Sequence, residues 1–250
     1  MNRPTIAPLA AAAVVLLAPL SGHAALSAYS QNFESLVQAS PTALGDDGWK
    51  IYGDVFNLDG SYSYGYGVYA APNGTAGFSS IATGQGGPAQ GNQQLVVYSD
   101  FNNANQTTKR IEALVFHEQT ISAADAGATW TFQLDAKHGD LAGDSTAFAF
   151  IKTLNPAAGY ATTNYLPLTM TGISADWNHY SVSLPVDVVL SGQLLQFGFS
   201  ATATNYTASG TLYDNVSFAL AVPEPETYAL MLVGLGSVGA MVRRSSARQS

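Results

Sequence analysis

Short runs in which apolar and polar residues alternate recur through the middle of this chain. Residues 130–135 read WTFQLD, and residues 195–199 read LQFGF. Because successive side chains of a β-strand point to opposite faces, this period of two indicates strands with one buried face, as in antiparallel sheets. No stretch shows the period of an amphipathic helix over three turns. The alternation therefore predicts an all-β fold.

Residues 25–221 are predicted to form one domain. Runs rich in β-branched and aromatic residues are separated by clusters of Gly, Ser, Asn and Asp, which favour turns. The twelve runs are Ser30–Ser35, Trp49–Phe56, Tyr62–Tyr69, Gly77–Ala82, Gln94–Ser99, Arg110–Ile121, Thr129–Lys137, Ala147–Thr153, Tyr165–Met170, His179–Pro185, Leu194–Ala203 and Thr211–Leu220. This many short strands favour an antiparallel two-sheet sandwich of the jelly-roll type. Trp49 and Trp130 are expected in its core.

The N-terminal segment, residues 1–24, has the pattern of a removable signal peptide. Arg3 precedes an apolar run over residues 6–20, and small residues follow up to Ala24. An apolar run of this length suits the helix of a signal peptide better than a membrane span. An N-terminal anchor and a core helix are the alternatives.

The C-terminal segment, residues 222–250, combines a proline-rich break with a second apolar run. The run over residues 228–242 is shorter than the roughly 20 residues that cross a bilayer comfortably, and Arg243 and Arg244 follow it. We expect a transmembrane-like hydrophobic helix that holds the chain at the inner membrane only transiently. The break before it consists of Val222, Pro223, Glu224 and Pro225.

This tail resembles the PEP-CTERM sorting signal. The Val-Pro-Glu-Pro sequence, the apolar stretch containing Gly234 and Gly236, and the terminal arginines occur in the order typical of that signal. The resemblance implies a Gram-negative bacterium, export through the inner membrane, processing by an exosortase-type enzyme, and delivery to the cell envelope or an exopolysaccharide matrix. A generic C-terminal anchor is the alternative.

Charge and cysteine content exclude several classes of function. Residues 25–221 contain five Lys or Arg and fifteen Asp or Glu, a formal charge of −10. Such a surface repels phosphate backbones, so nucleic acid is not an expected partner. The chain has no cysteine, which excludes zinc–thiolate sites, cysteine nucleophiles and disulfides.

A second resemblance covers nearly the whole of residues 25–221. Residues 32–34 (NFE), 176–180 (DWNHY) and 212–218 (LYDNVSF) are similar to the galactose-binding-like jelly rolls that include many carbohydrate-binding modules. In that family the first and last strands meet, and a structural calcium often binds there. The resemblance implies calcium at Glu34 and Asp214, although Asn215 stands where a second carboxylate is often found. A solvated turn at Asp214 is the alternative.

Aromatic residues are the candidates for sugar binding. Tyr62, Tyr64 and Tyr66 alternate with small residues, so in a regular strand they share one face. Tyrosine offers a flat apolar ring with a hydrogen-bonding tip, which suits a sugar ring. Tyr52 and Trp177 are added to this set. Cross-strand packing of the tyrosines is the alternative.

No motif for catalysis is evident. The sequence has neither a Gly-x-Ser-x-Gly elbow nor a zinc-binding histidine motif, and Phe116-His117-Glu118 places His117 and Glu118 on opposite faces of a strand. The leading hypothesis is a non-enzymatic envelope or matrix protein associated with exopolysaccharide. A structural or adhesive surface protein without a sugar site is the second. A secreted hydrolase is the third, and it requires two carboxyl groups about 5–9 Å apart in a groove.

Overall fold

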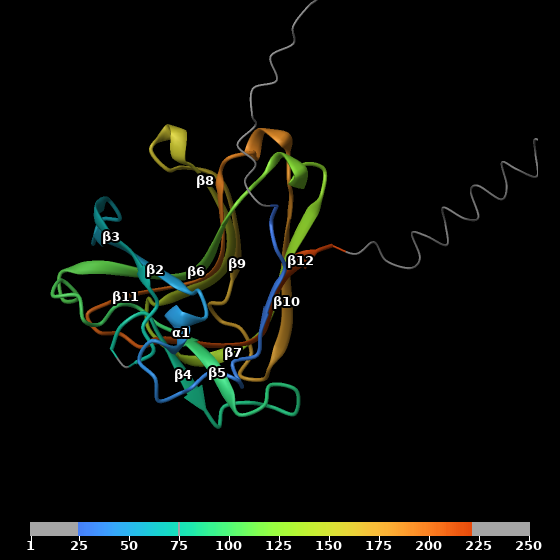
Figure 1. Ribbon diagram of the computed structural model, residues 1–250. Helices are drawn as coiled ribbons and strands as arrows, with labels where there is room; N and C mark the ends of the chain where they lie inside the picture. Colours follow the sequence, from blue (N-terminus) through green and yellow to red (C-terminus); the bar gives the residue numbers. More distant parts are fainter. Residues whose placement is uncertain (1–24, 75, 222–250) are drawn as a thin grey trace, which may run out of the picture.

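The computed structural model describes residues 25–74 and 76–221 (Figure 1). The predicted signal peptide (1–24), the sorting tail (222–250) and its apolar helix (228–242) lie outside these residues. Within the described part, no helix is long and apolar enough to cross a membrane.

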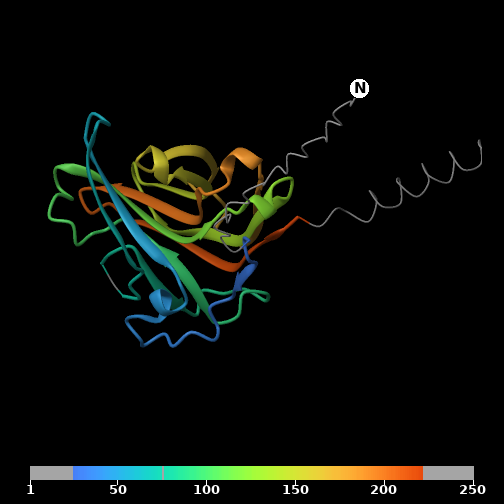
Figure 2. The same ribbon diagram turned by 45° about the horizontal axis from the view of Figure 1, so that its top comes forward.

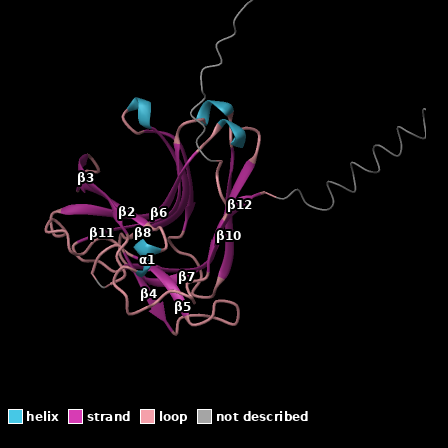
Figure 3. Ribbon diagram, in the orientation of Figure 1, coloured by secondary structure: helices cyan, strands magenta, loops and turns pink. Residues whose placement is uncertain are grey.

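The described residues form two antiparallel sheets that pack face to face, in agreement with the all-β jelly-roll sandwich expected from the sequence (Figure 3). Sheet A contains, in spatial order, β10 (Asn178–Pro185), β7 (Thr129–Leu141), β12 (Ser209–Leu220), β5 (Gln93–Val97) and β4 (Ser79–Thr83), with β1 (Tyr29–Gln31) paired to β12. Sheet B contains β3 (Tyr62–Ala70), β2 (Lys50–Asn57), β6 (Lys109–Thr120), β11 (Leu194–Thr204), β8 (Thr146–Asn155) and β9 (Ala161–Thr169). The helical elements are α1 (Ala43–Asp46), η1 (Ala123–Asp125), η2 (Pro156–Ala158) and η3 (Val188–Leu190).

All twelve predicted runs overlap a strand, and the first was predicted too long. β1 ends at Gln31, and Phe33 has a φ of 59°. This left-handed backbone ends the strand, and the Phe33 side chain is fully buried. β1 pairs with β12, so the first and last strands meet, as the second resemblance implies.

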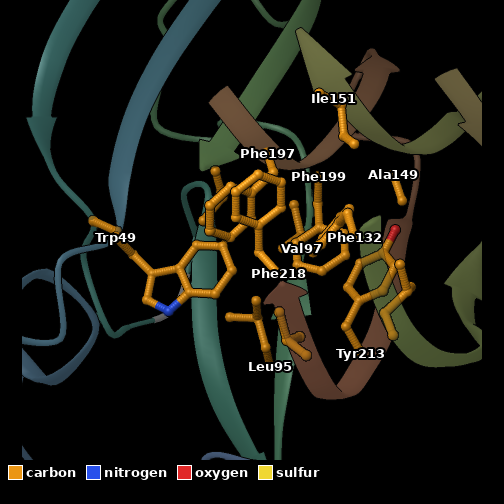
Figure 4. Close-up of a cluster of buried hydrophobic side chains, with 14 of the residues drawn as sticks. Trp49, Leu95, Val97, Phe132, Ala149, Ile151, Phe197, Phe199, Tyr213 and Phe218 are labelled. Atoms are coloured by element: carbon orange, nitrogen blue, oxygen red, sulfur yellow. The ribbon is translucent and has the colours of Figure 1, made fainter. Parts of the chain in front are cut away.

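The core between the sheets is built on stacked aromatic rings (Figure 4). Phe197 of β11 stacks on Phe218 of β12 with ring centroids 4.3 Å apart, and Phe199 stacks on Tyr213 at 3.8 Å. Phe132 of β7 contacts both Phe197 and Phe199. These rings come from opposite sheets, so they fix how β7 and β12 sit against β11.

Truncating Phe197 tests this account of the core. Phe197→Ala should lower the free energy of unfolding by about 3–5 kcal/mol, since it removes a buried ring and leaves a cavity. The measurement is chemical denaturation followed by circular dichroism. Val188→Ala, at a side chain 63% exposed, is the control and should change stability by no more than about 0.5 kcal/mol. Equal midpoints for the two variants would contradict the account.

Candidate functional site

The outer face of sheet B carries a second apolar cluster, separate from the core. The inward residues of β6, such as Ala113 and Val115, belong to the main core. The alternate residues Leu114 and Phe116 form a small cluster with Phe150 of β8. Phe116 and Phe150 are fully buried although they lie on the outer face. Sheet B is therefore apolar on both faces along its central strands.

Gly198 lets the two phenylalanines approach each other. It lies between them in the sheet register, opposite Phe116 on one side and Phe150 on the other. A Cβ on this residue would clash with the backbone oxygen of Val115 and with Phe116. The absence of a side chain at Gly198 therefore leaves an apolar floor of two rings across three strands.

Phe116 also lines a groove of about 580 Å³ on the outer face. Tyr52 of β2 packs on the apolar cluster, and Tyr160, which follows η2, is exposed at the groove. The residues that line the groove are Tyr52, Asp54, Val68, Phe116, Glu118, Lys152, Leu154, Gly159, Tyr160, Thr162, Leu194 and Gln196. Aromatic, amide and charged side chains thus converge in one concave site.

One end of the groove holds a connected polar network. Lys50 forms a salt bridge of 2.9 Å with Glu118. The Nε2 of Gln196 donates to the other carboxylate oxygen of Glu118 at 2.7 Å. The Oε1 of Gln196 is buried and has no hydrogen-bond partner among the described residues. Because an unpaired buried acceptor is costly, a ligand hydroxyl that reaches it would be stabilised.

Charged groups also gather in the middle of the face. Asp54 of β2 lies directly opposite Glu112 of β6. Burial, and next the neighbouring Glu112, raise the pKa of Asp54 to about 6, while Lys152 opposes this shift. Burial lowers the pKa of Lys152, and the carboxylates of Asp54, Glu112 and Glu118 oppose that shift. The ammonium group of Lys152 lies 5.4 Å from the ring centre of Phe150.

A smaller hollow of about 270 Å³ lies on the same face, beyond Asp54. Phe56, Arg110, Glu112, Phe148 and Thr202 are among its lining residues. The polar surface therefore extends along the strands well past the main groove.

The predicted tyrosine stripe is divided between two faces, so the expectation that Tyr62, Tyr64 and Tyr66 share one face is wrong. The β2–β3 register pairs Val55 with Tyr64 and Phe56 with Tyr62, which leaves Ser63 as an extra residue. Such a bulge reverses the side on which the next residue projects.

Tyr62 therefore shares a face with Tyr52, which lines the groove. A Cβ on Gly65 would contact the hydroxyl groups of both tyrosines. Burial, and next the hydroxyl of Tyr62, raise the pKa of Tyr52 to about 12. Of the predicted sugar-binding residues, the structure brings these two together.

Tyr64 and Tyr66 project from the other side and hold a loop. The Tyr66 hydroxyl donates to Asp100 at 2.7 Å, and Asn105 donates to the Tyr64 hydroxyl at 2.8 Å. Tyr66 also packs against Phe78. Their observed contacts are structural.

Trp177 lies on the opposite sheet, just before β10. Its indole N–H donates to the backbone oxygen of Gln85 at 3.1 Å, and Lys137 lies over its ring. It is half-buried and is not in the groove. Trp49 and Trp130 are buried, as expected.

The predicted calcium residues lie where β1 and β12 meet. Asp214 is fully buried, and its Oδ2 has no hydrogen-bond partner within the described part of the chain. Burial raises the pKa of Asp214 to about 7, and the carboxylates of Glu34 and Asp135 contribute. Glu34 already accepts hydrogen bonds from the backbone N–H groups of Asn92 and Gln93. The unpaired Asp214 oxygen fits a cation, although the residues described include no group of three metal-binding side chains.

Asp135 is a polar centre beside this site, and its hydrogen-bond partners were not evident from the sequence. It accepts hydrogen bonds from Gln90 and Asn215, each at 2.8 Å, and lies 3.0 Å from His179 Nδ1. Burial acts to raise its pKa, but these hydrogen bonds hold it below the usual value. Its partners come from distant strands and loops, so only the strand register could have revealed them.

Comparison with known proteins locates the sorting signal. Residues 221–245 match the PEP-CTERM protein-sorting motif, which confirms the resemblance noted in the tail and indicates an exported, envelope-associated protein. A search of curated proteins finds no match.

Solved structures similar to this chain include carbohydrate-binding modules. A xylan-binding domain of family 22 is 15% identical, with a TM-score of 0.39, over 82% of this chain and 99% of its own. The enzymatically active domain of bacteriophage CBA120 tailspike protein 4 is 12% identical, with a TM-score of 0.42, over 75% of this chain. The family 22 and GH10 modules of a Clostridium thermocellum endo-1,4-beta-D-xylanase are 11% identical, with a TM-score of 0.39, over 77% of this chain. This chain spans 21% of the tailspike chain and 28% of the xylanase chain.

Calcium at Glu34 and Asp214 remains a prediction, and it can be tested by thermal unfolding. Calcium chloride should raise the melting temperature and a chelator should reverse the rise, because a ligand bound to the native state stabilises it. Asp214→Asn should abolish the response, and Asp176→Asn, at an exposed position, should retain it. A melting temperature that changes with neither calcium nor chelator would show that no calcium site exists here.

Proposed function

We propose that this exported protein binds a polysaccharide chain, without cleaving it, in the groove on the outer face of sheet B. The observation that carries the proposal is that the rings of Tyr52 and Tyr160 and the amide of Gln196 line one groove, with Tyr52 packed on the buried cluster of Phe116 and Phe150. Sugars present apolar C–H faces and many hydroxyl groups, so aromatic rings next to hydrogen-bonding side chains suit them.

The polar groups of the groove support a saccharide ligand further. Carboxylates such as Glu118 accept hydrogen bonds from hydroxyl groups, and lysine donates them. Opposite charges lie side by side, as in the Lys50–Glu118 pair. Because charges of both signs lie in and beside the groove, it favours a ligand with many uncharged hydrogen-bond donors and acceptors.

The sorting motif supports a proposal for where in the cell this binding takes place. A PEP-CTERM tail at residues 221–245 fits processing by an exosortase-type enzyme, with transient contact at the inner membrane of a Gram-negative bacterium. The ligand that we propose is exopolysaccharide in the envelope or matrix. A structural or adhesive protein without a sugar site is the competing account.

Calorimetric titration with the matrix polysaccharide of the source bacterium separates these accounts. Tyr52→Ala should weaken binding about tenfold or more, which corresponds to the roughly 1.4 kcal/mol expected for one aromatic contact. Gln196→Ala should also weaken it. Tyr64→Ala is the matched control from the same hairpin, since Tyr64 projects away from the groove, and it should bind like the wild type.

Two outcomes would contradict the proposal. One is no heat of binding with the wild-type protein, which would favour the structural account. The other is equal affinity of the Tyr52→Ala and Tyr64→Ala variants, which would place the saccharide elsewhere.

Glycoside hydrolysis is a second candidate function, favoured by the Asp54–Glu112 pair. Residues directly opposite in an antiparallel sheet share one face and have Cβ atoms about 4.5–5.5 Å apart, so the two side chains are neighbours, as the paired carboxylates of a retaining glycosidase must be. In that role, protonated Asp54 would give its proton to the leaving oxygen. The Glu112 carboxylate would attack the anomeric carbon, and water would then hydrolyse the glycosyl-enzyme ester.

An assay for new reducing ends tests this candidate. Activity should fall as the pH rises through the pKa of Asp54, about 6, because the general acid must be protonated. Asp54→Asn and Glu112→Gln should each abolish it, and the exposed control Asp176→Asn should not. No reducing ends from a polysaccharide that binds would exclude hydrolysis and leave binding as the function.

A further inference from the structure

β3 is an edge strand of sheet B whose backbone is paired on one side only (Figure 1). It pairs with β2, and no other described segment forms a backbone hydrogen bond to it. The tip of the β2–β3 hairpin stands clear of the rest of the ribbon in Figure 2. An edge of this kind presents a row of free N–H and C=O groups with which another strand can pair.

The sequence of β3 contains little that would block such pairing. Its nine residues, YSYGYGVYA, include no charge and no proline. Two register shifts fall within the strand, at Ser63 and Val68, and the four pairs from Tyr64 to Gly67 between them run without interruption. The other edge strands are better protected. β9 contains Pro167, β10 ends in Pro185, and β4 and β1 are only five and three residues long.

Exposed apolar side chains concentrate on this same strand. Tyr62, Tyr64, Val68 and Tyr69 are 38–61% exposed, and they make up four of the twelve large apolar side chains exposed among the described residues. Tyr62 projects from the outer face of the sheet, and Tyr64 and Tyr69 project from the other face, so a strand added at this edge would have exposed side chains beside it on both faces. An unpaired backbone and exposed apolar side chains therefore coincide on one strand.

The symmetry of strand pairing indicates a second copy of this chain as the partner. Residues 25–221 carry a formal charge of −10, so two copies repel each other along most approaches, and β3 is an uncharged edge. Antiparallel pairing of a strand with itself is self-complementary, as a two-fold interface requires. Tyrosines on both strands would then form cross-strand aromatic pairs.

We propose that β3 pairs antiparallel with β3 of a second copy, so that two B sheets join into one continuous sheet. The two-fold axis of such a pair is perpendicular to the sheet, which places both outer faces on the same side. If the proposed saccharide binding holds, two grooves would then meet one long polysaccharide chain, and their joint affinity would exceed that of a single groove.

Sedimentation velocity of the purified protein without saccharide tests the pairing over a wide range of concentration. The wild type should reach twice the mass of one chain. Val68→Lys/Tyr69→Lys should remain monomeric, because lysines on an edge strand must be desolvated when a second strand pairs with it and so disfavour the pairing. The matched control is Val188→Lys/Val189→Lys, at two exposed residues away from the edge, which should dimerise like the wild type.

Circular dichroism and the melting temperature must show that both double variants are folded. The proposal is overturned by a wild type that stays monomeric at every concentration. It is also overturned by a Val68→Lys/Tyr69→Lys variant that dimerises as well as the control. Because no saccharide is present, neither result bears on binding in the groove.

Discussion

The structure depends on the requirement that the central strands of sheet B be buried on both faces. Their inner face packs through Phe197 and Phe199 against the aromatic rings of sheet A. Their outer face carries Phe116 and Phe150, which are just as buried but face no second sheet. Burying these rings requires cover from neighbouring side chains, and Tyr52 of β2 supplies part of it. The groove lies beside Tyr52, where the side chains no longer cover this face of the sheet.

The groove combines stability and function in the same residues. An apolar floor is stabilised by removal from water, whereas the polar groups around it are stabilised only if they are paired. Glu118 is paired with Lys50 and Gln196. Asp54 and Lys152 are half-buried, and this burial raises the pKa of Asp54 and lowers that of Lys152. Groups held in this state are suited to exchange hydrogen bonds with a ligand, which is why this face is the strongest candidate for function.

Much of the fold could be predicted from the sequence, because alternation is a local signal. Twelve runs located twelve strands, and the all-β sandwich followed from their number. The candidate site was harder to predict because it depends on strand register. The bulge at Ser63 places Tyr62 and Tyr64 on different faces, and nothing in the alternation YSYGY reveals it. A usable signal did exist in β6, where residues 113–116 are apolar on both faces.

The account rests most directly on where a saccharide contacts the protein. Chemical-shift mapping by NMR, with oligosaccharides from the matrix polysaccharide added to isotope-labelled protein, measures this. The account predicts that the perturbed amides lie in β2, β6, β8 and β11, around Tyr52, Phe116, Phe150 and Gln196. Perturbations confined to sheet A around Trp177, or none at saturating saccharide, would contradict it.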